Sequence, residues 1–254
     1  MSSLPLAGVN VAITRPRDQA KKLTHLIESA GGHVILFPLI EIVALDDVSP
    51  FEHVIAKIND YDWVVFISSN AVQHGMPHLL KHTIPSHLKF AAIGPVTAKE
   101  LKDFGVEDVL IPEGRFDSES LLSMPQLQDM QGKKVMIVRG VGGREVLADT
   151  LKSRGATVTF AECYQRINPQ DNIELLAKAW SNEHLKAIVV TSSEAMRHLL
   201  DLAKDASWLK QVTLCVNHAR VADEPMAMGL NVKVAEAPGD ESMLSILSTI
   251  RRAQ

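Results

Sequence analysis

The sequence has few of the features that mark secreted, membrane-spanning or metal-binding proteins. Its 254 residues include only two cysteines, Cys163 and Cys215, which form no CxxC pair, so a disulfide framework is excluded. No apolar run approaches the roughly 18 residues that a membrane span requires. The opening residues also lack the charged and apolar regions of a secretory signal. We therefore expect a cytoplasmic protein that makes no contact with a membrane.

Basic charge and aromatic side chains are scarce as well. Lysine and arginine number 26 against 30 acidic residues, a net charge of −4, and no basic run stands out. Seven phenylalanines, three tryptophans and two tyrosines leave little material for stacking on bases. Binding to nucleic acid by bulk charge is disfavoured. The chain is long enough for one large domain or two small ones of about 100–200 residues.

The chain contains a weak internal duplication at an offset of 124 residues. The segment VNVAITRP aligns with KKVMIVRG, and DWVVFISSNAVQH aligns with KAIVVTSSEAMRH. The period is longer than the about 20–50 residues of solenoid repeats, so it predicts two related domains. The identities gather where strands end and helices begin, and they pair Arg15 with Arg139, Gly31 with Gly155, Ser68 with Ser192, Ser69 with Ser193, and His74 with His198.

Each copy alternates short β-branched runs with longer amphipathic stretches. Runs such as VVFI and AIVV are continuously apolar, which is typical of parallel strands covered by helices on both faces. Gly31 and Gly155 follow amphipathic stretches at positions expected for left-handed helix caps. The pattern predicts an α/β protein made of two doubly wound, flavodoxin-like parallel-sheet domains.

Two segments, residues 33–45 and 156–169, are expected to be too long for single strands, which usually have about 5–6 residues. They occupy equivalent places in the two copies, and Pro38 interrupts the first. One interpretation is that each segment leaves one domain and enters the other, which makes both domains discontinuous. The alternative is two consecutive halves that meet near Gln126.

Small polar residues follow strands at equivalent positions in the two copies, as Ser68-Ser69-Asn70 and Ser192-Ser193. Helix N-termini at the carboxyl end of a parallel sheet present free N–H groups that suit anions. Simple helix capping by the serine hydroxyl explains the same residues without a ligand. Both interpretations stay open at this point.

The segment VRGVGGRE partly matches the dinucleotide fingerprint GxGxxG, with Gly140, Gly142 and Gly143 expected to follow a strand and to open a helix. Its sixth position is Glu145 rather than glycine, and no P-loop lysine follows, which argues against a nicotinamide-dependent enzyme. The neighbouring Arg139 and Arg144 instead suggest a clamp for carboxylates. The alternative is two exposed arginines on a loop.

Other candidate groups are weak. The histidines His74, His78 and His82 are spaced like ligands on one helix face, but Pro77 lies among them and no HExxH motif is present, so we predict no metal site. The two cysteines are expected to be buried, unreactive side chains. Tyr164 lies in the second long segment, where its phenol is able to donate a proton or to pack at a strand end.

A set of short segments recurs in a distinctive order along the chain: VAITRP, FPLIEI, DWVVFISSNAV, AAIGPVTAKEL, VMIVRGVGGREVLADTLKSRGA, CYQR, IVVTSSEAM and VAEAPGDESML. Taken together, these motifs resemble the uroporphyrinogen-III synthase family over nearly the whole chain. The resemblance supports the discontinuous assignment: a first domain of residues 1–36 plus 167–254 and a second of 37–166, with linker strands near 37–42 and 162–167.

The resemblance implies a cofactor-free reaction in tetrapyrrole biosynthesis. The family's substrate, hydroxymethylbilane, is a linear tetrapyrrole with eight carboxylates, which is closed with loss of water and inversion of the last pyrrole through a spiro intermediate. Tyr164 matches the family's cleft tyrosine, a candidate general acid. The residues that would hold the carboxylates are Arg15, Ser68, Ser69, Asn70, Gly94, Thr97, Arg139, Gly142, Arg144, Ser192, Ser193, His218 and Arg220.

One departure concerns the segment Asn217–Arg220, where relatives often carry small hydroxyl residues; His218 or Arg220 would substitute there. The resemblance further implies a monomer, with transient contact to the preceding or following pathway enzyme. A two-domain ligand sensor, similar in architecture to periplasmic binding proteins, is the alternative from another class.

Overall fold

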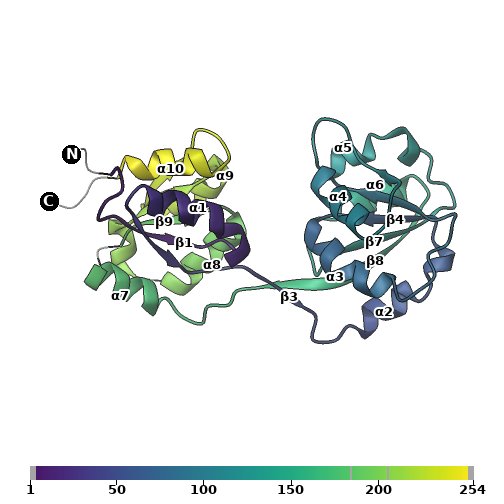
Figure 1. Ribbon diagram of the computed structural model, residues 1–254, viewed down its shortest axis with the longest axis horizontal. Helices are drawn as coiled ribbons and strands as arrows, with labels where there is room; N and C mark the ends of the chain where they lie inside the picture. Colours follow the sequence, from purple (N-terminus) through teal and green to yellow (C-terminus); the bar gives the residue numbers. More distant parts are fainter. Residues whose placement is uncertain (1–3, 184, 205, 251–254) are drawn as a thin grey trace. The chain divides into compact units, whose positions relative to one another are not determined.

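The computed structural model describes residues 4–183, 185–204 and 206–250, which fall into two compact units (Figure 1). The first unit holds the chain up to Glu41 and again from Ile167 onward. The second unit holds residues Ile42–Arg166. The chain therefore leaves the first unit once, builds the second, and returns.

The first unit is built on a parallel sheet whose strands lie in the order β11-β10-β9-β1-β2. Numbered along the unit, this is the order 2-1-3-4-5 of flavodoxin-like sheets, as the sequence predicted. Its strands are β1 (Asn10–Ile13), β2 (His33–Leu36), β9 (Leu185–Val190), β10 (Thr213–Val216) and β11 (Asn231–Val234). Its helices are α1 (Arg17–Ser29), α7 (Glu174–Glu183), α8 (Ser193–Ala203), α9 (Ala219–Ala227) and α10 (Asp240–Ser248), with a 3₁₀ turn at Ser207–Gln211.

The second unit has a sheet in the order β3-β8-β7-β4-β5-β6. Apart from β3, it repeats the first sheet strand for strand, because β7, β8, β4, β5 and β6 stand where β1, β2, β9, β10 and β11 stand. The strands are β3 (Glu41–Ala44), β4 (Trp63–Phe66), β5 (Lys89–Ala92), β6 (Val109–Leu110), β7 (Lys134–Gly140) and β8 (Thr157–Ile167). The helices are α2 (Ser49–Ile55), α3 (Ser69–Leu79), α4 (Pro95–Asp103), α5 (Ser118–Leu122) and α6 (Val146–Ser153), with 3₁₀ turns at Ile58–Asp60 and Pro125–Leu127.

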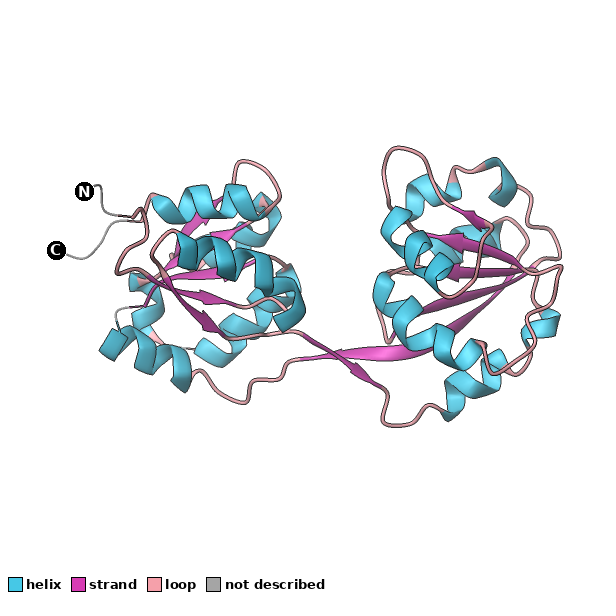
Figure 2. Cartoon of the chain, viewed as in Figure 1, coloured by secondary structure: helices cyan, strands magenta, loops and turns pink. Residues whose placement is uncertain are grey.

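Continuous apolar strands form these sheets because helices cover both faces (Figure 2). In β9, Ala187 and Val189 pack with α1 and α10, whereas Ile188 and Val190 pack with α7, α8 and α9 on the other face. In β4, Val64 and Phe66 pack with α2, α3 and α4, and Val65 packs with α5 and α6. Each unit therefore has two hydrophobic layers, one on each side of its sheet.

The two long segments differ from each other in the structure. Residues 33–45 contain two short strands, β2 and β3, which belong to different sheets. The expectation that residues 156–169 also exceed a single strand is wrong, because β8 is one strand of 11 residues. It pairs with β7 on one side and neighbours β3 on the other, so partners are available along its length.

Glycine is required where α6 turns into β8. Gly155 has a φ of +91°, a left-handed conformation that costs other L-residues about 1–2 kcal/mol. A Cβ at this position would also lie 2.9 Å from Cα of Gln131. Gly31 ends α1 in the same conformation, with a φ of +87°, so the predicted pair of left-handed caps is confirmed.

We predict that Gly155→Ala lowers the free energy of unfolding by about 2–5 kcal/mol, because backbone strain and a backbone clash add together. The matched control is Gly8→Ala, whose φ of +75° carries the strain but whose Cβ would have no atom within 4 Å. It should cost only about 1–2 kcal/mol. Urea unfolding followed by circular dichroism measures both; equal losses would show that the contact with Gln131 contributes nothing.

Candidate active site

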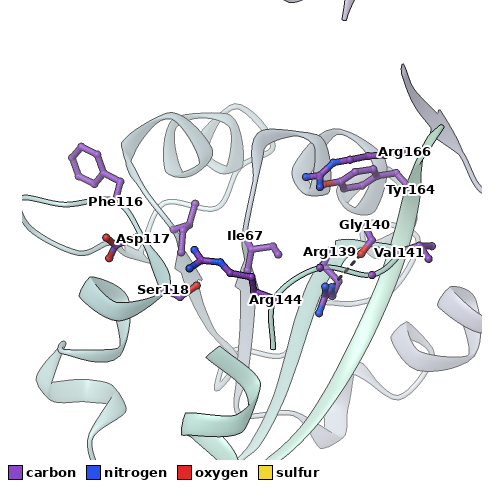
Figure 3. Close-up of a pocket in the computed structure, with 13 residues that line it drawn as sticks. Ile67, Phe116, Asp117, Ser118, Arg139, Gly140, Val141, Arg144, Tyr164 and Arg166 are labelled. Atoms are coloured by element: carbon purple, nitrogen blue, oxygen red, sulfur yellow. Dashed lines mark hydrogen bonds between the residues drawn. The ribbon is translucent and has the colours of Figure 1, made fainter. Parts of the chain in front are cut away.

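A cavity of about 350 Å³ opens at the carboxyl ends of β4 and β7 in the second unit (Figure 3). These two strands are neighbours at the point where the strand order reverses, which is where open α/β sheets bind ligands. The cavity falls at the lower end of the about 300–1,000 Å³ typical of ligand pockets. It is lined by Ile67, Ile93, Phe116, Asp117, Ser118, Arg139, Gly140, Val141, Gly142, Gly143, Arg144, Tyr164 and Arg166.

Tyr164 reaches this cavity through an irregularity in β8. Arg139 of β7 pairs with Glu162, but the next residue, Gly140, pairs with Tyr164, so β8 carries one extra residue here. Such a bulge re-aims the side chains beyond it. The Tyr164 side chain is only 1% exposed, and its ring packs in the core layer beside α3.

Three groups hold the Tyr164 ring. Its hydroxyl lies 3.2 Å from Oγ of Ser68, and the imidazole of His74 faces its ring at 5.6 Å between centroids. Gly140 lies directly against the ring, because a Cβ there would be 2.5 Å from Cε2 of Tyr164 (Figure 3). Burial lowers the pKa of His74, which keeps that imidazole neutral at physiological pH.

Both predicted serine positions cap helices. Ser68 Oγ accepts the backbone N–H of Ala71 at 3.0 Å at the start of α3, and Ser192 Oγ accepts that of Ala195 at 3.1 Å at the start of α8. The capping interpretation is thus confirmed for both. Ser69 and Asn70 begin α3, and Ser193 begins α8.

Arg139 is not one of two exposed loop arginines, the alternative that the sequence left open. It belongs to β7 and is only 3% exposed, with its guanidinium 4.6 Å from the ring centre of Phe160. Its Nε donates to the carbonyl of Gly140 at 3.1 Å. Among the described residues, no carboxylate lies within 4.0 Å of this guanidinium. Arg144, by contrast, is 70% exposed and lies 3.5 Å from Glu119.

The prediction that Gly142 begins a helix is wrong. Gly142 and Gly143 have φ values of +71° and +103° in a loop, and α6 begins only at Val146. The N–H of Gly142 donates to the carboxylate of Glu162 at 3.1 Å, so the protein's own acid occupies it. A dinucleotide phosphate would have to displace that carboxylate.

The remaining predicted residues lie outside this cavity. Gly94 precedes α4 and packs against Phe116, and Thr97 is buried in the first turn of that helix. Arg15 follows β1 in the first unit and forms a 2.5 Å ion pair with Asp240. His218 and Arg220 are exposed where α9 begins, after β10.

Sequence reasoning missed much of the cavity wall. Phe116, Asp117 and Ser118 come from the loop after β6 and the start of α5, where no motif marks them. Ile67 and Ile93 each follow a strand directly, at the carboxyl edge where ligands bind. That position was the signal that would have found them.

Metal and thiol chemistry find no support among the described residues. No group of three or more His, Cys, Asp or Glu side chains in that part of the chain is arranged to hold a metal ion. Burial raises the pKa of both Cys163 and Cys215 to about 12, so both stay protonated at neutral pH.

No helix among the described residues is long and apolar enough to cross a membrane.

Comparison with known proteins identifies the family. The family model for uroporphyrinogen-III synthase HemD matches residues 21–245. The uroporphyrinogen-III synthase of Salmonella typhimurium is 33% identical over 94% of this chain and all of its own length, and that of Escherichia coli is 31% identical over the same shares. The chain belongs to the uroporphyrinogen-III synthase family. Its function is therefore that of a hydro-lyase in tetrapyrrole biosynthesis.

Solved structures agree on the fold. A mutant uroporphyrinogen III synthase from Thermus thermophilus superposes with a TM-score of 0.65 at 20% identity, covering 95% of this chain and 98% of that one. The Helicobacter pylori enzyme gives 0.58 at 17% identity, covering 96% and 100%. Family membership sets aside the nicotinamide-dependent enzyme and the ligand sensor as alternatives.

We predict that Gly140→Ala displaces the Tyr164 ring, because the new methyl group would overlap it. If this ring belongs to the catalytic machinery, activity should fall at least about tenfold, because a misplacement of about 1 Å is enough for such a loss. Steady-state kinetics and the near-ultraviolet circular dichroism of the tyrosine measure the two effects. Unchanged activity together with a changed tyrosine signal would show that the reaction does not depend on the position of this ring.

Proposed function

We propose that the cavity at the ends of β4 and β7 is the catalytic centre for closing hydroxymethylbilane to uroporphyrinogen III, and that Tyr164 is its general acid. The observation that carries the proposal is a phenol held by Ser68, His74 and Gly140 at the wall of a cavity at the switch point. A phenol O–H is able to donate a hydrogen bond or a proton.

Tyr164 would protonate the terminal hydroxyl of the substrate, which then leaves as water. The net reaction releases only water, so the proton lent by the phenol returns to it when the last pyrrole loses its own proton on closure. General acid assistance of this kind contributes about 10²–10⁴-fold. Because the substrate also closes spontaneously without inversion, positioning of the last ring decides the product.

Arg139 is the cation best placed to hold a substrate carboxylate. A buried guanidinium without a carboxylate partner among the described residues is costly, and a bound carboxylate removes that cost. The ring of Phe160 supplies cation–π stabilisation but no negative charge. Asp117 is the acidic residue of the cavity wall. Hydrogen bonds from the Ser120 side chain and from the Ser120 N–H lower the pKa of its carboxyl group.

Other roles remain predictions. The proposal also includes substrate-carboxylate binding by eleven residues that the sequence predicted: Arg15, Ser69, Asn70, Gly94, Thr97, Gly142, Arg144, Ser192, Ser193, His218 and Arg220. The same holds for a cytoplasmic monomer, a reaction without a cofactor, and transient contact with a neighbouring pathway enzyme.

We predict that Tyr164→Phe lowers turnover of hydroxymethylbilane by about 10²–10⁴-fold, because the acid is lost while the ring packing stays. Spontaneous closure then overtakes the enzyme, and the product shifts from isomer III towards isomer I. Chromatography of the oxidised products measures the isomer ratio. Wild-type protein that yields only isomer I would refute the function, and an unaffected Tyr164→Phe variant would refute the acid.

We predict that Arg139→Met raises KM about 10–100-fold, because a charge-assisted contact to a carboxylate is lost. The unfolding midpoint should not fall, since a buried cation without an ion-pair partner is removed. Lys152→Met is the matched control: its ammonium also faces the Phe160 ring, at 6.0 Å, but it does not line the cavity. Equal KM values for the two variants would remove Arg139 from substrate binding.

A further inference from the structure

The hydroxyl of Ser68 has two hydrogen-bonding neighbours, a backbone N–H and a phenol hydroxyl. Its oxygen accepts the N–H of Ala71 at 3.0 Å, and the Tyr164 hydroxyl lies 3.2 Å away. A serine hydroxyl carries one proton. The N–H of Ala71 occupies one lone pair of Oγ, and the described residues offer no acceptor for the serine proton other than the Tyr164 oxygen.

We infer that Ser68 is a positioning residue whose hydroxyl donates a hydrogen bond to the Tyr164 oxygen. The phenol's own O–H then points into the cavity. The inference rests on the proposed function, in which Tyr164 is the acid. It gives Ser68 a role different from binding a substrate carboxylate, which was the prediction from sequence.

Two features favour this direction of donation. A hydroxyl that already accepts a hydrogen bond is polarised and becomes a stronger donor. Ser68 also stands at the N-terminus of α3, a helix of 11 residues whose dipole favours negative charge nearby. The phenolate left after proton transfer would accept a hydrogen bond from the Ser68 hydroxyl close to that helix end.

The imidazole beside the phenol does not compete for its proton. His74 faces the Tyr164 ring at 5.6 Å, with 33° between the planes, and this is a ring contact rather than a hydrogen bond. Burial lowers the pKa of His74 and so makes this imidazole a weaker proton acceptor. Ser68 is therefore the side chain that orients the phenol hydroxyl.

The duplication supplies an internal comparison. Ser192 caps α8 in the same way that Ser68 caps α3. At the repeat position of Tyr164, however, the first copy has Ile40, which has no hydroxyl. Capping alone therefore accounts for Ser192, whereas Ser68 has an additional contact.

Three substitutions at Ser68 separate capping from donation. Ser68→Ala loses both; Ser68→Thr keeps both; Ser68→Asp keeps the cap but has no proton to give. We expect kcat to fall about 3–30-fold in the alanine and aspartate variants, with KM within about twofold of wild type, and to recover in the threonine variant. The melting temperature should fall in Ser68→Ala and, by a similar amount, in Ser192→Ala, because each variant loses a helix cap. It should not fall in Ser68→Asp, which keeps the cap.

Several outcomes would overturn the inference. If kcat of Ser68→Ala equals or exceeds the wild-type value, the phenol donates its hydrogen bond to Ser68 in the wild-type protein instead. If Ser68→Asp is as active as wild type, only capping matters. A Ser68→Ala variant that raises KM with kcat unchanged would return the residue to substrate binding.

The double variant Ser68→Ala/Tyr164→Phe keeps this test distinct from that of the proposed function. We expect it to be no slower than Tyr164→Phe alone, because Ser68 acts through the phenol. Additive losses would overturn the inference while leaving the acid intact. An unaffected Tyr164→Phe would instead refute the proposed acid itself.

Discussion

The close approach of the Tyr164 ring to Gly140 is the contact on which the site depends. It exists because β8 bulges after Glu162 and so sets the phenol opposite the one residue of β7 that lacks a side chain. With any larger residue at position 140 the ring would have to move away from Ser68, 96 residues earlier in the chain. A backbone irregularity thus determines where the phenol hydroxyl lies.

The electrostatics of the cavity follow from the same strand. Arg139 immediately precedes Gly140, and its Nε binds the Gly140 carbonyl, so the cation and the phenol are held by adjacent backbone groups. The guanidinium is buried against Phe160 without an ion pair among the described residues. A substrate carboxylate bound there would lie in the same cavity as the proposed acid, which suits a reaction whose outcome depends on how the substrate is folded.

The sequence predicted the scaffold more completely than the site. Apolar runs and glycine caps identified the parallel sheets, because burial of a strand on both faces leaves a local signal in the sequence. The 124-residue offset paired each strand of one sheet with its counterpart in the other. The cavity wall depends on contacts distant in sequence. Neither the burial of Arg139 nor the hydrogen bond between Glu162 and Gly142 follows from a motif, since both require knowing which strands pair. The helix expected at Gly142 is absent because Gly142 and Gly143 have positive φ values, which a right-handed helix does not allow.

The two copies of the fold show how one scaffold supports different chemistry. Arg15 and Arg139 occupy the same repeat position, yet Arg15 is neutralised by Asp240 of α10 while Arg139 has no such partner among the described residues. The serine caps are shared, but only the second unit has a tyrosine opposite its cap. Burial of the strands constrains both copies alike, whereas the residues at the carboxyl edge are free to differ. The asymmetry of those few partners therefore explains why we assign the acid to the second unit.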